Sequence, residues 1–232
     1  MRQLNLPLRR PATRSFDSFV AGPNGMALTQ LLEVAAMRPG AVATPIYLWG
    51  PAGCGKTHLL QALAAALGAR GIAIGRFDGF SPLPWPLDER RGLVIFDGCD
   101  DFEAAHQQAA FAQFVDARSR GAWVAAAGRV PPVDLPLRED LRSRLGWGHV
   151  LAVQPLAEAD VQTVLREEAR RRGLCLSDDV STYVLSHFAR DLKSLMVLLD
   201  RADDFALSQQ RALTVPLIRQ LQAEPESSAV RS

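Results

Sequence analysis

The feature that most constrains the fold of this chain is a glycine-rich segment between an apolar run and a helical run. It fits the pattern G-x-x-x-x-G-K-[ST] and consists of Gly50, Pro51, Ala52, Gly53, Cys54, Gly55, Lys56 and Thr57. Residues 46–49 precede it as a short apolar run, and residues 58–67 follow it with a helical pattern. In a strand–loop–helix unit, the glycines let consecutive backbone N–H groups turn toward one phosphate at the helix start. The segment therefore predicts a site for a nucleoside diphosphate or triphosphate.

Two side chains at the end of this segment have predicted roles of their own. We expect Lys56 to reach the β- and γ-phosphates, and we expect the Thr57 hydroxyl to hold Mg²⁺. His58 is expected to pack or hydrogen-bond beside the loop, because the four histidines of the chain are scattered and lack metal-site spacing. A plain turn with an exposed lysine is the alternative, which the flanking strand and helix patterns disfavour.

Composition sets the class of protein. Of 232 residues, 48% are hydrophobic and 22% are charged, which is ordinary for one medium domain with a smaller companion. The net charge of +1 gives no general basic field that would draw the chain onto nucleic acid or an anionic membrane. Three widely spaced cysteines without a C-x-x-C pair indicate reduced thiols. Because no apolar run is long enough to span a membrane, we expect a soluble, cytoplasmic protein.

Apolar runs and helical patterns alternate through residues 15–154. The apolar runs are residues 46–49, 72–77, 93–96, 123–127 and 149–153, and the clearest helical patterns cover residues 25–37 and 103–120. Strands that alternate with helices predict an α/β domain whose parallel sheet is covered by helices on both faces. Residues 80–87 contain three prolines and are expected to form a loop, in which Trp85 is either a contact residue or part of the local packing.

The pattern changes after Pro155. Residues 158–172, 178–188 and 192–208 have helical patterns, and Thr214 with Pro216 begins a last short helix. No strand pattern remains, so residues 155–222 are expected to form a small, all-helical lid domain. Residues 1–14 are expected to be a flexible tail, because they are short, basic and interrupted by Pro7 and Pro11. Residues 223–232 are expected to form a second, frayed tail.

An acid at the end of a strand is the second expected part of the nucleotide site. Asp97 directly follows the apolar run 93–96, where it would hold the Mg²⁺ shell, unless it merely ends a buried strand. Many nucleoside triphosphatases have a second acid at the next position, which orients the attacking water, but this chain has Gly98 there. Asp100 and Asp101 are expected to cap the next helix instead.

A polar sensor side chain is also expected near the end of the strand at residues 123–127. The chain offers three alanines there, followed by Gly128 and Arg129, so no short polar side chain is available. Two parts needed for hydrolysis are thus missing from one site. We expect nucleotide binding to be intact and hydrolysis in the chain's own site to be weak or absent.

Two arginines precede the last predicted strand. Arg142 and Arg144 could project from the domain edge toward the nucleotide of a neighbouring molecule, where a guanidinium can raise hydrolysis by roughly 10³–10⁵. Surface ion pairs with Glu139 or Asp140 are the alternative, and spacing alone favours them.

With these features together, the chain resembles the AAA+ ATPases, and within them the family of the bacterial replication initiator DnaA and its shorter relative, the regulatory inactivator Hda. The likeness spans about residues 15–222 and is carried by residues 15–24, 46–60, 131–132, 143–148 and 190–195.

The resemblance implies roles for individual residues. It implies that ADP or ATP is bound with Mg²⁺ by the glycine-rich segment and His58, with Thr57 and Asp97 at the metal. Residues 15–24 correspond to a segment that lies against the adenine, which assigns Phe19 to the nucleotide site. Arg144 matches the arginine finger, which acts in trans, and Lys193 falls at the second sensor in place of the usual arginine.

The N-terminus is similar to the peptide by which inactivators dock onto the replicative sliding clamp, the β subunit of the DNA polymerase. An amide and apolar side chains that suit such a groove are present at Gln3, Leu4, Leu6, Pro7 and Leu8. Pro7 would keep the peptide extended and lower the ordering cost of binding. A tail that folds back on its own body is the alternative. The chain also ends soon after the expected lid, where the initiator continues into a helix-turn-helix domain.

The resemblance implies a regulator that holds nucleotide, docks on the clamp and stimulates hydrolysis of ATP bound to DnaA, which prevents re-initiation of replication. A helicase-loader-like ATPase that turns over its own ATP is the alternative. A direct DNA-binding factor is disfavoured by the near-neutral charge, and residues 170–172 are expected to form a solvated, basic helix end. The implied partners are the clamp and DnaA, with a homo-oligomer as a further option, DNA reached only indirectly, and no membrane.

Overall fold

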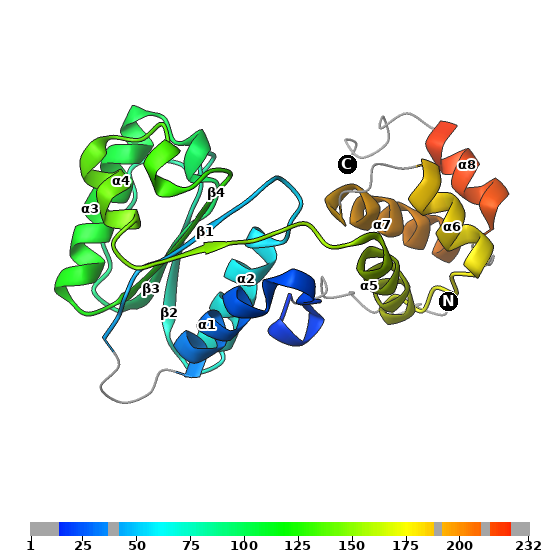
Figure 1. Ribbon diagram of the computed structural model, residues 1–232, viewed down its shortest axis with the longest axis horizontal. Helices are drawn as coiled ribbons and strands as arrows, with labels where there is room; N and C mark the ends of the chain where they lie inside the picture. Colours follow the sequence, from blue (N-terminus) through cyan, green and yellow to red (C-terminus); the bar gives the residue numbers. More distant parts are fainter. Residues whose placement is uncertain (1–13, 37–41, 188–191, 210–213, 224–232) are drawn as a thin grey trace, which may run out of the picture. The chain divides into compact units, whose positions relative to one another are not determined.

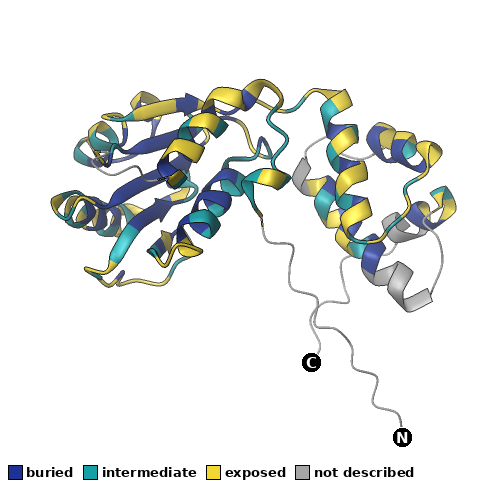
Figure 2. Ribbon diagram, turned by 90° about the horizontal axis from the view of Figure 1, so that it is seen from below, coloured by how far each residue is buried: buried dark blue, intermediate teal, exposed yellow. Residues whose placement is uncertain are grey.

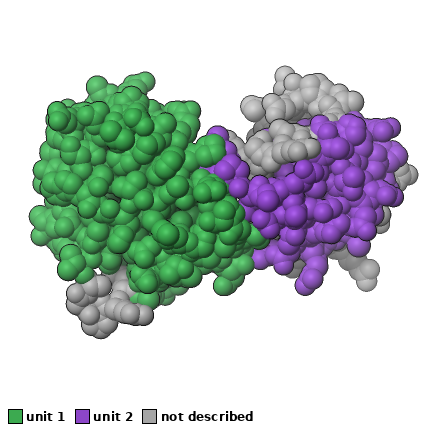
Figure 3. All heavy atoms as spheres, viewed as in Figure 1, with its two compact units in different colours: residues 1–51, 55–154 green, residues 52–54, 155–232 purple. Residues whose placement is uncertain are grey.

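The computed structural model describes residues 14–36, 42–187, 192–209 and 214–223 (Figure 1). The chain divides into two compact units, of which the first comprises residues 1–51 and 55–154 and the second comprises residues 52–54 and 155–232 (Figure 3). The N-terminal peptide that resembles a clamp-binding motif lies outside the described residues. Each unit is considered separately below.

The first unit is built on a five-stranded parallel sheet. Its strands are β1 (Ile46–Trp49), β2 (Ala73–Phe77), β3 (Arg91–Phe96), β4 (Trp123–Gly128) and β5 (His149–Ala152), in the order β2-β3-β4-β1-β5. Because all strands run the same way, their carboxyl ends share one edge of the sheet. Gly50, Asp78, Asp97 and Arg129 directly follow strands at this edge.

Helices cover both faces of the sheet, so the predicted α/β architecture is confirmed. Helices α1 (Gly25–Ala36) and α2 (Lys56–Gly68) lie on one face, and α3 (Ala104–Ser119) and α4 (Glu139–Leu145) lie on the other (Figure 1). Residues 93–96 of β3 are all buried, and Val94 and Phe96 belong to the core on the α3 side. Figure 2 shows the buried strands between helices whose outer surfaces are exposed. Burial on both faces explains why the central strands β1, β3 and β4 are largely apolar runs, whereas the edge strands β2 and β5 are partly exposed.

The loop between β2 and β3 is anchored by Trp85, which settles the role of this residue. Its side chain is 7% exposed and stacks on Phe77, with 4.5 Å between ring centroids and 22° between ring planes. Gln113 of α3, itself 1% exposed, donates from Nε2 to the backbone oxygens of Trp85 and Pro86, at 3.2 and 3.0 Å. Trp85 is therefore part of the local packing.

The second unit is all-helical. It contains α5 (Glu158–Arg171), α6 (Asp178–His187), α7 (Leu192–Gln209) and α8 (Val215–Ala223). Apolar side chains from all four helices form its core, among them Val161, Leu165, Val184, Leu195, Leu199 and Ile218. None of the helices in the residues that the structure describes has the length and apolar character that a membrane span requires.

The basic helix end at residues 170–172 differs from the prediction only at Arg172, since Arg170 and Arg171 are exposed. Arg172 pairs with Glu168 at 2.6 Å and with Asp200 of α7 at 2.8 Å, and its side chain is only 13% exposed. Arg171 also pairs with Glu168, at 3.6 Å. Arg172 therefore links α5 to α7 and is largely shielded from solvent. A local helical pattern could not indicate its pairing with Asp200.

Candidate nucleotide-binding site

The glycine-rich segment connects β1 to α2 at the carboxyl edge of the sheet. Helix α2 begins at Lys56, after Gly55, which has a left-handed conformation with φ 105°. A Cβ atom at residue 55 would come within 2.9 Å of Phe19 Cε2, so the close approach of Phe19 also requires glycine. No side chain in the described residues caps this helix start. The N–H groups of its first turn can therefore serve a phosphate, which the helix dipole favours.

The Lys56 side chain is hydrogen-bonded to the beginning of the glycine-rich segment. Its Nζ donates to the backbone oxygens of Gly50 and Pro51, at 2.7 and 2.8 Å. The ammonium group thus lies over the loop that would surround a phosphate. An anion at this place would meet both the ammonium charge and the helix N-terminus.

Thr57 and Asp97 meet although 40 residues separate them. The Thr57 hydroxyl donates to Asp97 Oδ1 at 3.2 Å, while the Asp97 N–H donates to Phe77 O at 2.9 Å. Burial raises the pKa of Asp97 above its ordinary value, against the opposing effects of the Thr57 hydrogen bond and the Lys56 charge. A hydroxyl and a carboxylate side by side are oxygen ligands of the kind that Mg²⁺ prefers.

A cavity of about 150 Å³ adjoins Asp97 and is lined by Leu60, Gln61, Arg76, Phe77, Asp78, Ile95 and Asp97. Within the described part of the chain, no three His, Cys, Asp or Glu side chains come together as a metal site. Mg²⁺ at Thr57 and Asp97 would therefore take its other ligands from phosphate oxygens and water, which is its usual mode in nucleotide sites.

The segment before α1 packs on the start of α2. His58 donates from Nε2 to Ser15 O at 3.0 Å, and its Nε2 lies 3.1 Å from Ser18 Oγ. Because a carbonyl oxygen can only accept, this contact assigns the imidazole proton to Nε2. Phe19 meets the His58 ring edge-on, with centroids 5.5 Å apart. The structure thus brings Phe19 and His58 together beside the glycine-rich segment, and the packing predicted for His58 is confirmed.

Asn24 is a residue of this region that sequence reasoning missed. It is 2% exposed, it donates from Nδ2 to Gln154 O at 2.9 Å, and its Oδ1 accepts from Gln154 N at 2.7 Å. The side-chain amide therefore pairs with the backbone like a neighbouring strand, which ties the entry segment to the exit of β5. A separation of 130 residues leaves no local signal for this pairing.

Gly98 has φ 69° and begins the 3-10 turn η3 (Cys99–Asp101). The backbone here is left-handed, so the chain turns away directly after Asp97 instead of extending in a way that would present a second acid. The sequence has Gly98 where a second acid would stand, and the left-handed backbone at this residue would be unfavourable for an acid.

The expectation that Asp100 and Asp101 cap the next helix is wrong. Helix α3 begins after Glu103, and the Asp100 carboxylate instead accepts from the Arg129 N–H, at 3.0 and 2.7 Å to its two oxygens. The Arg129 side chain pairs with Asp101 at 2.7 Å. The turn η3 directs these carboxylates across to the exit of β4, so they join two strand ends.

Gly128 stands at the last position of β4, close to Tyr47 of the neighbouring strand. The Tyr47 hydroxyl donates to Val130 O at 2.9 Å, and a Cβ atom at residue 128 would overlap it. The lack of a polar side chain at this position is therefore a requirement of the packing.

Arg144 lies on α4, whose Leu141 and Leu145 are buried. Its guanidinium carbon is 5.1 Å from the ring centroid of Phe111 and 5.2 Å from that of Trp147. Asp140 pairs with Arg138 at 2.8 Å. Within the described residues neither Arg142 nor Arg144 forms the ion pair with Glu139 or Asp140 that spacing favours, and Arg144 is held by aromatic rings.

Solved structures of replication proteins share the fold. Domain III of the replication initiation protein DnaA from Thermotoga maritima matches with a TM-score of 0.75 at 20% identity, over 95% of this chain and 100% of that chain. The AMPPCP-bound DnaA from Aquifex aeolicus matches at 0.66 and 19%, over 82% and 65%. The RuvB Holliday junction branch migration motor of Thermotoga maritima also matches at 0.66 and 19%, over 90% and 71%. At these identities the likeness establishes the fold alone.

Two family models decide the relationship. The model described as the bacterial DnaA ATPase domain matches residues 11–71, which include the glycine-rich segment. The model described as the lid domain of Hda matches residues 158–221, which include most of the helices of the second unit. The chain is a DnaA-related AAA+ protein of the Hda type.

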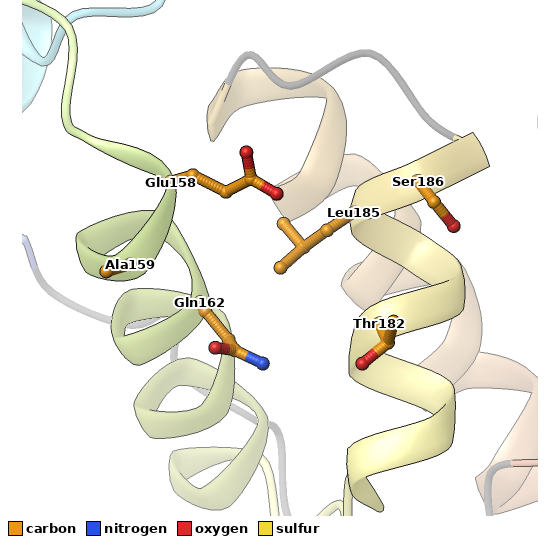
Figure 4. A pocket seen from close by; sticks show the side chains of 6 residues that line it. All are labelled: Glu158, Ala159, Gln162, Thr182, Leu185 and Ser186. Atoms are coloured by element: carbon orange, nitrogen blue, oxygen red, sulfur yellow. The ribbon is translucent and has the colours of Figure 1, made fainter.

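Two predicted parts of this Hda-type protein, the side chain of Lys193 and the peptide at residues 3–8, lie outside the described residues. In the lid, a cavity of about 340 Å³ opens between α5 and α6 and is lined by Glu158, Ala159, Gln162, Thr182, Leu185 and Ser186 (Figure 4). None of these six residues was predicted from the sequence to take part in a site.

Proposed function

We propose that this Hda-type protein is a nucleotide-bound regulator of replication initiation. In this proposal it holds ADP with Mg²⁺, docks on the replicative sliding clamp through residues 3–8, and stimulates hydrolysis of ATP bound to DnaA. It works in the cytoplasm at the replisome and reaches DNA only through the clamp and DnaA. Re-initiation is prevented because DnaA loses its ATP.

The observation that carries the proposal is the contrast between two arginine environments. Arg129, at the exit of β4, is bound to the carboxylates of Asp100 and Asp101. Arg144 is half-buried, lies over two aromatic rings, and has no carboxylate partner among the described residues. A guanidinium that is not neutralised by its own chain can serve a phosphate on another molecule.

The chain's own site supports holding nucleotide more than turning it over. The N–H groups at the start of α2 would bind the phosphates, Lys56 would neutralise their charge, and Thr57 with Asp97 would orient the metal. Bound Mg²⁺ would neutralise phosphate charge. The residue directly after Asp97 is Gly98, which has no side chain to orient a water.

The test is hydrolysis of ATP preloaded on purified DnaA, in the presence of DNA-loaded clamp. The wild type should accelerate the loss of ATP, and Arg144→Ala should lose most of this acceleration, since an arginine finger contributes roughly 10³–10⁵-fold to the rate. Arg142→Ala, on the same helix, is the matched control and should keep the activity. Deletion of residues 1–8 should abolish clamp binding without changing nucleotide binding.

The opposite result would favour a helicase-loader-like remodeller. If the wild type leaves ATP on DnaA unchanged while the protein alone turns over ATP faster than about 1 s⁻¹, within the ordinary enzyme range, the regulator proposal fails.

A further inference from the structure

Arg144 is bracketed by aromatic rings from two different elements. Phe111 belongs to α3, and Trp147 follows the end of α4; we call this pair the aromatic bracket. An aromatic face attracts a guanidinium through its negative quadrupole, and it leaves the in-plane N–H donors available to an acceptor. The bracket can therefore hold the charged group in place without consuming its hydrogen-bonding capacity.

A carboxylate partner would occupy the N–H donors of an arginine, whereas an aromatic ring does not. Arg138 also lies over the Phe111 ring, at 5.5 Å, but it is committed to Asp140 at 2.8 Å. A phosphate would have to displace such a partner, whereas an aromatic ring stays in contact while the phosphate is bound. Of these two neighbouring arginines, Arg144 is the one whose surroundings suit an incoming anion.

The two rings are anchored to different degrees. Phe111 is half-buried and packs against the core on the α3 side of the sheet. Trp147 is 66% exposed, so its burial contributes little to folding. Leu145, two residues before it, is 1% exposed and fixes the end of α4 from which the indole projects. Phe111 thus gives the bracket a rigid base, and Trp147 closes it from the solvent side.

We propose that Phe111 and Trp147 are positioning residues that orient the Arg144 guanidinium toward a phosphate of a nucleotide on a partner protein. This inference rests on the proposed function, because it assigns the residues that make Arg144 effective. An arginine side chain has several rotatable bonds, and holding it in one orientation lowers the entropic cost of meeting the phosphate in the transition state.

The experiment compares Trp147→Ala, Trp147→Phe and the exposed aromatic control Phe80→Ala, since Phe80 is 91% exposed. The maximal rate of ATP loss from DnaA should fall about two- to five-fold in Trp147→Ala, the size of one cation–π contact at an exposed site. Trp147→Phe should restore most of the rate, and Phe80→Ala should leave it unchanged. All three variants should keep the unfolding temperature within about 2 °C of the wild type, because the side chains are largely exposed.

A second readout does not depend on DnaA. The Nε–Hε resonance of Arg144, assigned by its loss in Arg144→Ala, should move in Trp147→Ala because the ring current of the indole is removed, and it should not move in Phe80→Ala. An unmoved resonance, or a maximal rate equal to that of the wild type, would overturn the inference. A loss that is regained by adding more protein would also overturn it, because that result indicates a docking contact instead of orientation.

The rates of the wild type and of Trp147→Ala together separate the inference from the proposed function. If the wild type does not accelerate ATP loss at all, the proposed function fails and the positioning role fails with it, whatever the resonance does. If the wild type accelerates ATP loss and Trp147→Ala matches it, the proposed function stands and only the role of the bracket is lost.

Discussion

The hydroxyl of Tyr47 fills the space that a side chain at residue 128 would need. The same hydroxyl donates to Val130 O at 2.9 Å, so it fixes the chain where β4 ends. This position is where a polar sensor would be sought in a hydrolysing site. The packing of β1 against β4 therefore excludes a side chain at a place where hydrolysis would benefit from one.

Gly128→Ala should destabilise the protein by about 1–3 kcal/mol, because the added methyl group overlaps the Tyr47 hydroxyl. Tyr47→Phe alone should also destabilise it, by about 1–3 kcal/mol, because Val130 O loses its buried donor. The double variant should be less destabilised than the sum of the two, since the phenylalanine makes room for the methyl group. Urea unfolding measures all three, and effects that add within about 0.5 kcal/mol would contradict the proposed overlap.

Lys56→Ala should weaken nucleotide binding about tenfold to a hundredfold, because hydrogen bonds to a charged group contribute about 1.5–3 kcal/mol. Titration with a fluorescent ADP analogue measures the dissociation constant. Since the ammonium binds the carbonyl oxygens of Gly50 and Pro51, the fold of the variant is checked by circular dichroism. A folded variant that binds ADP as tightly as the wild type would exclude the glycine-rich segment as the phosphate site.

Asp97→Asn should raise the melting temperature of the nucleotide-free protein at pH 7. Burial raises the pKa of Asp97 in the folded state, so ionisation of this carboxyl costs stability once the pH rises above its ordinary pKa of 3.8. The gain should disappear below that pH, where the carboxyl is protonated in both the folded and the unfolded state. The same variant should weaken Mg²⁺-dependent binding of nucleotide.

The check on Asp97→Asn is a melting series across pH, with and without Mg²⁺ and ADP. A variant that is less stable than the wild type at pH 7 would show that the Thr57 hydrogen bond and the Lys56 charge outweigh the cost of burying the carboxylate.

Trp85→Ala should destabilise the first unit by about 3–5 kcal/mol, the usual cost of removing a buried tryptophan. Its ring packs between Phe77 and Phe102, and its backbone oxygen accepts from Gln113. Phe80→Ala, in the same loop but 91% exposed, should change stability by no more than about 0.5 kcal/mol. Equal effects of the two substitutions in chemical denaturation would contradict the buried role of Trp85.

Gly98→Ala should cost about 1–2 kcal/mol, although the nearest atom to an added Cβ, Asp101 Oδ2, is 3.5 Å away. The penalty comes from the left-handed backbone at φ 69°, since space is available. Gly68→Ala, near the end of α2 with nothing within 4 Å of the added Cβ, is the matched control and should be neutral or stabilising. A neutral Gly98→Ala would show that the turn after Asp97 is not fixed.

Most helices and strands could be predicted from the amino-acid sequence, because their signals are local. The run Ile46–Trp49, the glycine-rich segment and α2 follow one another without interruption, so phosphate-loop chemistry could be recognised before any contact was known. The apolar run before Asp97 likewise placed that acid at the end of a strand. Buried parallel strands are apolar on both faces and amphipathic helices repeat every few residues, so the five strands and the longer helices lie close to the predicted ranges. Helix α4, which has only seven residues and carries Arg144, was not predicted.

The partners of side chains from distant segments depend on the folded arrangement and could not be predicted. Asp100 and Asp101 look like helix caps in sequence, but the 3-10 turn after Gly98 carries them to Arg129. Asn24 with Gln154, and Arg144 with Phe111, are likewise pairings of segments whose separation in sequence carries no periodic signal. Side-chain partners depend on which strand ends and helix ends the sheet order brings to one edge, and that order is set by the packing of the whole unit.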